Sequence, residues 1–134
     1  MEAREIHHVG LAVVDLDEAI RTYEALFGAR LEHREELVGQ GAEAASVLVG
    51  GSRIELVAAT GPDTPVGRFV ASRGPGMHHI AYRVTDIVDA LAELAAAGVQ
   101  LVDTEPHRGL FGLQVAFLHP DAVHGVLTEV VSDG

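Results

Sequence analysis

Two histidines and two glutamates occupy matching positions in the two halves of this chain of 134 residues. His8 and His79 each follow another histidine, and each begins a run of alternating apolar residues. Glu55 and Glu129 each interrupt an apolar run, where a carboxylate is costly unless it is solvated, paired or bound to a metal. Two imidazoles and two carboxylates suit a divalent ion such as Co, Mn, Ni or Zn and leave coordination positions for substrate oxygens. We therefore predict one metal site formed by these four residues.

The elements that must position these residues occur twice, in the same order. Each half begins with an alternating run that predicts a strand, followed by an Asp suited to cap a helix, an apolar pattern of helical spacing and a closing Gly. Asp15 and Gly28 bound the first helix, and Asp86 and Gly98 bound the second. The predicted strands are residues 6–13, 30–37, 43–49 and 53–58 in the first half, and 77–84, 99–102, 113–118 and 125–131 in the second.

This order predicts an α+β fold of two tandem βαβββ modules, whose strands form a curved eight-stranded open barrel with a metal-binding cleft. Module one covers about residues 5–60, a connector with a short helix covers about 61–75, and module two covers about 76–132, all in a single domain of residues 1–134. The strand faces that carry His8 and His79 also carry small residues, so we expect these faces to line the cleft. The larger residues that alternate with them, such as Leu11, should pack under the helices.

The composition limits the partners and the chemistry of the chain. The formal net charge is −11 and all nine basic residues are Arg, which disfavours nucleic acids and anionic membranes as partners. Cys is absent, so disulfides and thiolate chemistry are excluded. Neither a signal peptide nor a membrane-spanning run is recognisable, so the expected location is the cytoplasm.

Several segments carry a resemblance to a known family that extends over nearly the whole chain. They resemble the vicinal oxygen chelate superfamily, which includes glyoxalases, bleomycin resistance proteins and dioxygenases, and within it the methylmalonyl-CoA epimerases. The segments are Ile6–Val13 (IHHVGLAV), Gly76–Val84 (GMHHIAYRV), Phe117–Pro120 (FLHP), Gly125–Glu129 (GVLTE), Gln40-Gly41, and the loop with Glu105-Pro106, Gly109 and Gly112.

The resemblance implies a metal-dependent epimerase that interconverts (R)- and (S)-methylmalonyl-CoA. It implies a metal site at His8, Glu55, His79 and Glu129 that holds cobalt or a similar divalent ion, an acyl-CoA thioester as substrate, and a homodimer. The α-hydrogen leaves as a proton, and the negative charge spreads onto the thioester oxygen as an enolate that a metal stabilises.

Inversion needs a proton-transfer group on each side of the α-carbon. Glu129 is the candidate for one of them. Some epimerases place a second Glu three residues after the glycine that corresponds to Gly41, a position that holds Ala44 here. Glu43 is the neighbouring candidate, although strand alternation directs it to the opposite face unless a bulge re-aims it.

Two other functions use the same scaffold. A glyoxalase-I-like lactoylglutathione lyase needs the same four metal ligands, whereas a non-catalytic small-molecule-binding member commonly lacks them. A ring-cleaving dioxygenase is disfavoured, because it would use two histidines and one carboxylate for iron. No phosphate-binding motif for coenzyme A is present, which leaves Arg73, Arg83 and Arg108 as candidate contacts to anions. Of the remaining histidines, we interpret His33 and His124 as surface residues.

Overall fold

The structure is a computed structural model that describes residues 1–133, which contain three α-helices and eight strands. Two compact units are distinguished: His8–His78 form one, and Met1–His7 together with the residues from His79 onward form the other. Strand β1 (Glu5–Ala12) and strand β5 (Gly76–Arg83) each contribute residues to both units. Within the described residues, no helix is long and apolar enough to cross a membrane.

The unit His8–His78 contains a four-stranded arrangement in the order β2-β3-β4-β1. Strand β3 runs antiparallel to β2 and to β4, whereas β1 runs parallel to β4. The chain order is β1, α1, β2, the 3-10 helix η1, β3, β4 and α2. The bounds are Leu16–Phe27 for α1, Arg30–Leu37 for β2, Val38–Gln40 for η1, Ala42–Val49 for β3, Ser52–Ala59 for β4 and Pro65–Arg73 for α2.

The other unit has the strand order β5-β8-β7-β6. Strand β8 runs parallel to β5 and antiparallel to β7, so this unit repeats the pairing pattern of the first. The bounds are Ile87–Ala96 for α3, His107–Arg108 for β6, Leu110–Gly112 for η2, Gln114–Leu118 for β7, Pro120–Val123 for η3 and Thr128–Ser132 for β8.

Equivalent Asp residues begin the first helix of each repeat. The Asp15 side chain accepts a hydrogen bond of 3.0 Å from the backbone N–H of Glu18, and Asp86 accepts one of 3.1 Å from Asp89. Gly28 ends α1 in the left-handed conformation, with φ of 63°, which Gly adopts at low cost. Both predicted helices and the caps Asp15, Gly28 and Asp86 are therefore confirmed, whereas the C-cap of α3 is Ala97, one residue before the predicted Gly98.

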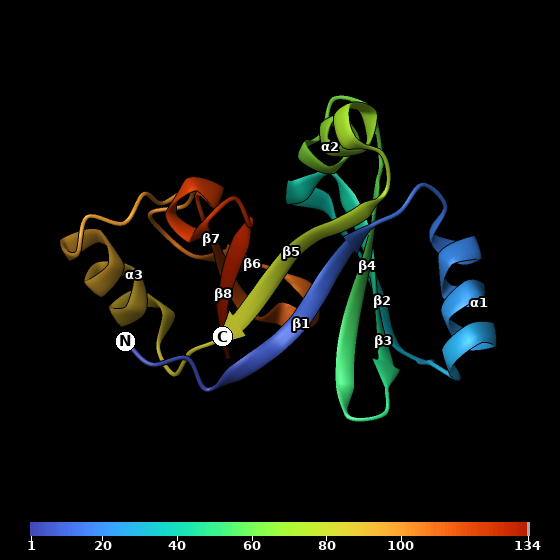
Figure 1. Cartoon of the computed structure of the whole chain (residues 1–134), viewed down its shortest axis with the longest axis horizontal. Helices are drawn as coiled ribbons and strands as arrows, with labels where there is room; N and C mark the ends of the chain where they lie inside the picture. The colour runs from blue at the N-terminus through green and yellow to red at the C-terminus, as the bar shows by residue number, and fades with distance from the viewer. Residues whose placement is uncertain (134) are drawn as a thin grey trace. The chain divides into compact units, whose positions relative to one another are not determined.

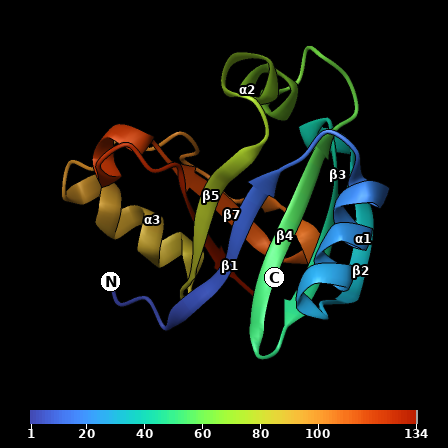
Figure 2. The same cartoon turned by 45° about the vertical axis from the view of Figure 1, so that its right-hand side comes forward.

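In each unit, the helix of the repeat covers one face of the strands (Figure 1). In the unit His8–His78, α1 packs on β3 and β4 (Figure 2). Leu16 and Ile20 of this helix lie in the same core as Val47 and Leu56. In the other unit, α3 packs its apolar residues on β7 and β8. The opposite faces carry Ala12 in one unit and Ala81 in the other. Leu11 packs against the core under α1, as predicted, whereas the other faces carry both small residues and valines such as Val57 and Val131.

The predicted strand at residues 99–102 is wrong. Only Leu101 makes an isolated bridge, to Leu118. The backbone N–H groups of Val102 and Asp103 both donate to the carbonyl of Phe117, and the side chain of Asp103 accepts the Phe117 N–H at 2.8 Å. A side chain therefore takes the place of a backbone partner here, which ends the ladder. The edge strand β6 forms later, at His107–Arg108.

Truncating the α1 core tests this packing. Leu56→Ala removes a side chain with 0% exposure, so it should destabilise the protein by about 2–5 kcal/mol through lost burial and a residual cavity. The control Leu26→Ala changes a residue of α1 that is 68% exposed and should shift stability by about 0.5 kcal/mol or less. Urea denaturation would measure both, and equal effects would contradict the assignment of this core.

Candidate metal centre

The first His–Glu pair lies on two parallel strands. Gly10 of β1 is the register partner of Glu55 of β4, so His8, two residues before Gly10, projects from the same face as Glu55. The Nε2 atom of His8 lies 3.1 Å from Oε2 of Glu55, and both side chains are buried. Burial lowers the pKa of His8, the Arg53 charge lowers it further, and Glu55 opposes both. Burial therefore favours a neutral imidazole, which is the form that binds metals.

The second pair repeats this arrangement in the other unit. Ala81 of β5 is the register partner of Glu129 of β8, and His79 again lies two residues earlier on the same strand. The Nε2 atom of His79 lies 4.0 Å from Oε1 of Glu129, and the ring packs edge-on against Phe117 with centroids 5.6 Å apart. The structure therefore brings together the two members of each predicted pair, in the same strand register.

Burial strongly perturbs the carboxyl group of Glu129. Its side chain is deeply buried, and this burial raises its pKa from 4.5 to about 8; His107 lowers the value somewhat and Asp103 raises it. His107 lies at the sheet edge, with Nε2 3.3 Å from the Asp103 carboxylate and its ring stacked near Phe117. A buried carboxyl that titrates near neutral pH is typical of metal and proton-transfer sites.

The candidate catalytic residue Glu43 lies on the wrong face for the site. Its register partner is Ala58, which packs in the core under α1, whereas the next residue, Ala44, faces the side that carries Glu55. Arg34 donates a hydrogen bond of 2.9 Å to the Glu43 carboxylate and also binds Asp17 of α1. The β3–β4 register is regular at this position, so no bulge re-aims the side chain. The structure therefore argues against a catalytic role for Glu43.

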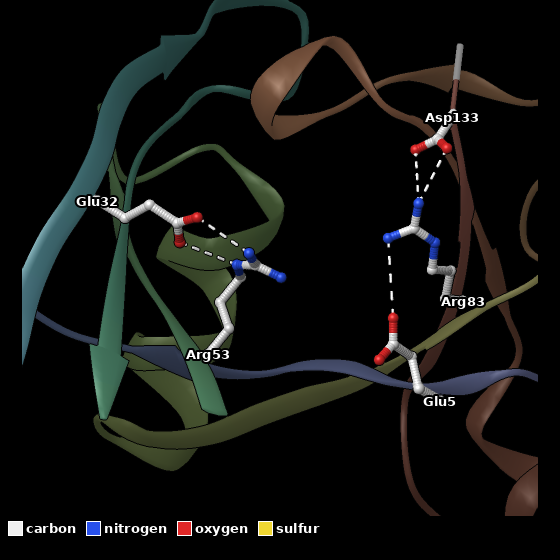
Figure 3. Close-up of polar contacts among 5 residues, drawn as sticks. All are labelled: Glu5, Glu32, Arg53, Arg83 and Asp133. Carbon is white, nitrogen blue, oxygen red and sulfur yellow. Dashed lines mark hydrogen bonds and ion pairs between the residues drawn. The ribbon is translucent and has the colours of Figure 1, made fainter. Parts of the chain in front are cut away.

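A polar network beside Glu55 was missed from the sequence. Arg53 of β4, two residues before Glu55 on the same face, donates from Nε and Nη2 to both carboxylate oxygens of Glu32, at 3.0 and 2.9 Å (Figure 3). Ser46, the register partner of Glu55, donates to the same carboxylate at 2.9 Å. A bulge at Glu32, which is evident from the register shift between Leu31 and His33, places this carboxylate in the network, and no clear signal in the sequence marks it.

Two of the candidate anion-binding arginines already have partners. Arg83 donates to both carboxylate oxygens of Asp133, at 3.0 and 2.9 Å, and lies 3.7 Å from Glu5 (Figure 3). The guanidinium of Arg73 lies 5.6 Å from the centroid of the Phe69 ring. These side chains are exposed or half-exposed, so the contacts are structural pairs of modest strength.

The pKa of Glu129 predicts a pH-dependent stability for the metal-free protein. Because the folded state holds the proton up to about pH 8 and the unfolded state only to about 4.5, stability is highest below the lower value and falls as pH rises between the two. Glu129→Gln removes this term. In chelator, the stability of the wild type relative to Glu129→Gln should fall by up to about 1.4 kcal/mol per pH unit between about pH 5.5 and 7.5. If urea titrations gave the wild type and Glu129→Gln the same dependence of stability on pH, the raised pKa of Glu129 would be contradicted.

Comparisons with known proteins assign the chain to a family. The sequence profile of the glyoxalase/bleomycin resistance protein/dioxygenase superfamily matches residues 7–117. The mitochondrial methylmalonyl-CoA epimerase of Dictyostelium discoideum is 33% identical over 127 residues, which cover 94% of this chain and 76% of the relative. The ethylmalonyl-CoA/methylmalonyl-CoA epimerase of Cereibacter sphaeroides is 32% identical over 127 residues, 93% of this chain and 95% of the relative.

A solved structure extends the match to the fold. A variant of Streptomyces coelicolor methylmalonyl-CoA epimerase, in complex with 2-nitronate-propionyl-CoA, matches with a TM-score of 0.95 and 35% identity, over 99% of this chain and 96% of that one. This agreement confirms the α+β fold class predicted from the sequence. The chain belongs to the glyoxalase/bleomycin resistance protein/dioxygenase superfamily, within which its relatives are the methylmalonyl-CoA epimerases.

Proposed function

We propose that this protein is a metal-dependent epimerase that interconverts (R)- and (S)-methylmalonyl-CoA. The observation that carries the proposal is the pair of buried His–Glu contacts, placed in equivalent strand registers of a chain related to such epimerases over nearly its full length. The same similarity favours the epimerase over the lactoylglutathione lyase and over a non-catalytic binding protein.

The donor set fits a divalent ion. His8, His79 and Glu129 are buried, and each offers one ligand atom; Glu55 is the buried partner of His8. A neutral imidazole and a carboxylate in each repeat satisfy the charge of a divalent cation, which in turn offsets the cost of burying two acids. We propose that these four residues hold one ion. When bound, such an ion supplies Lewis-acid stabilisation of the negative charge that develops on the thioester carbonyl.

Glu129 is proposed as one of the two proton-transfer groups. Glutamate carboxyls serve as general acids and bases in enzymes, and that of Glu129 is buried beside His79. One carboxylate oxygen of Glu129 would take the α-proton of one epimer and return it when that epimer re-forms. The edge contact between His79 and Phe117 limits rotation of the adjacent ligand ring.

The finer parts of the proposal come from the family resemblance. They are cobalt as the bound ion, methylmalonyl as the acyl group, a homodimer and a cytoplasmic location. The Cereibacter sphaeroides relative is named for both ethylmalonyl-CoA and methylmalonyl-CoA, so we include ethylmalonyl-CoA as a second substrate to be tested. Measurement of the mass in solution tests the dimer.

Solvent exchange tests the reaction directly. In deuterated water, the cobalt-loaded protein should replace the α-hydrogen of (S)-methylmalonyl-CoA with deuterium and form the (R) epimer, because the proton removed mixes with solvent before it is returned. Mass spectrometry and a chiral assay would measure the two processes. The absence of both with Co, Mn, Ni and Zn would overturn the proposed function.

Ligand variants test the metal site. His8→Ala and His79→Ala should each lose stoichiometric cobalt and lower the exchange rate on the order of 10³-fold, because several kcal/mol of charge stabilisation is lost. The control His124→Asn alters an exposed histidine in a left-handed position that Asn tolerates, and should keep both properties. Elemental analysis would measure the metal. Retention of a full complement of cobalt in both alanine variants would contradict the site.

A further inference from the structure

An aromatic residue stands beside Glu129 on the neighbouring strand. Phe117 of β7 is the register partner of Glu129, so the two side chains project from the same face with Cβ atoms about 4.5–5.5 Å apart. On the other side of Glu129, its register partner on β5 is Ala81. All three residues belong to the unit that continues from His79, so their arrangement is fixed within that unit.

Phe117 offers a substrate an apolar surface that three neighbours on this face do not offer. Ala81 is 0% exposed, and Val115 and Val131, two residues along β7 and β8, are 4% and 1% exposed. Phe117 is partly exposed. An apolar substituent gains free energy only by covering surface that water still reaches, so of these four residues Phe117 is the one that can receive it.

Neighbouring groups hold the Phe117 ring and its backbone in place. The ring packs edge-on against His79, with centroids 5.6 Å apart, and stacks at 6.5 Å from the ring of His107. The Asp103 carboxylate accepts the Phe117 N–H at 2.8 Å and also lies 3.3 Å from Nε2 of His107, so one acid braces both the backbone and the second ring. The Phe117 ring therefore cannot swing aside for a larger group without losing these contacts.

The proposed reaction keeps the alkyl substituent of the substrate in one place. When Glu129 takes the α-hydrogen as a proton, the C–H electron pair passes toward the thioester oxygen and the α-carbon becomes planar. The proton leaves and returns across the two faces of this plane, so the alkyl group lies near the same position in both epimers. The thioester and carboxylate oxygens are directed toward the metal ligands, among them His79 on β5. Because β8 lies between β5 and β7, the alkyl group then points toward Phe117.

We propose that Phe117 limits the size of the alkyl substituent on the α-carbon of the substrate. A methyl group fits against the ring, and each further methylene presses on a side chain that His79 and His107 hold in place. One methylene in an apolar pocket changes kcat/KM by about 10–200-fold. The protein therefore acts on short alkylmalonyl-CoA thioesters and discriminates against long ones. This inference rests on the proposed function and adds to it the residue that selects the acyl group.

Selectivity between two substrates tests the assignment, with the cobalt-loaded full chain. In the wild type, the ratio of kcat/KM for butylmalonyl-CoA to that for methylmalonyl-CoA should be on the order of 10⁻² or less. Phe117→Leu removes the ring and should raise this ratio on the order of 10-fold or more, for both epimers, because both place the alkyl group against the same side chain. The matched control Phe27→Leu alters an exposed phenylalanine of α1 and should leave the ratio within about twofold of wild type.

Two further measurements separate substrate fit from damage to the site. A His79 ring that loses its contact with Phe117 would lower the rate for both thioesters together and leave their ratio unchanged. Phe117→Met introduces a flexible side chain that fills irregular gaps, so it disturbs packing little and should raise the ratio in the same direction. Dimethylmalonyl-CoA and 2-butyl-2-methylmalonyl-CoA have no α-hydrogen, so calorimetry measures their binding without turnover; Phe117→Leu should narrow the difference between their dissociation constants.

The outcomes distinguish this assignment from the proposed function. An unchanged ratio in folded, cobalt-loaded Phe117→Leu and Phe117→Met would overturn the assignment, and so would a ratio raised for one epimer alone or an equal rise in Phe27→Leu. A wild-type protein that epimerises neither thioester would instead overturn the proposed function. Thermal unfolding and cobalt content, measured for each variant, show which proteins are folded and loaded.

Discussion

The burial of a carboxylate beside an imidazole, once in each repeat, is the constraint on which the site depends. Glu55 and Glu129 lie in sheets whose other buried residues are largely apolar, where an unpaired charge is expensive. One outcome is protonation, and the raised pKa of Glu129 shows that tendency. The other is a cation, which repays the cost for both acids together and draws on the neutral histidines as ligands. The proposed metal therefore resolves an electrostatic cost that the fold creates.

The repeat places the two pairs without any special loop. In each unit a parallel strand pair puts the residue two positions after the histidine opposite the glutamate. The helix of the repeat covers the other face of the strands, and small residues such as Ala12 and Ala81 lie on the face that carries the ligands. Position in the sheet, rather than local sequence, thus decides which polar groups are available for chemistry.

The period of the apolar residues and the spacing of the polar ones predicted most of the fold and of the candidate metal site. The alternating runs, the capping residues Asp15 and Asp86, and the matching His and Glu positions identified both repeats and both pairs before any coordinates. Two features were not predicted, and both depend on which residues pair across neighbouring strands. The strand near residue 101 is lost because Asp103 takes a ladder hydrogen bond, and the bulge at Glu32 leaves no clear mark in the sequence.

That bulge also changed the interpretation of the acids. Alternation alone gave the correct face for Glu43 but could not show that Glu35 shares the face of Ala44, because one extra residue reverses the order. His33, interpreted as a surface residue, has a side chain that is 37% exposed, and it also contacts Glu35. The absence of an acid at Ala44 was thus visible in the sequence, whereas the face to which Glu35 projects required knowledge of strand pairing.

Diffraction from crystals grown with cobalt tests the central claim most directly, because anomalous scattering locates the ion independently of the protein atoms. We expect one cobalt peak per chain, at about 2.0–2.2 Å from the imidazole nitrogens of His8 and His79 and from carboxylate oxygens of Glu55 and Glu129. A fully occupied peak elsewhere, or none at these four side chains, would contradict the account.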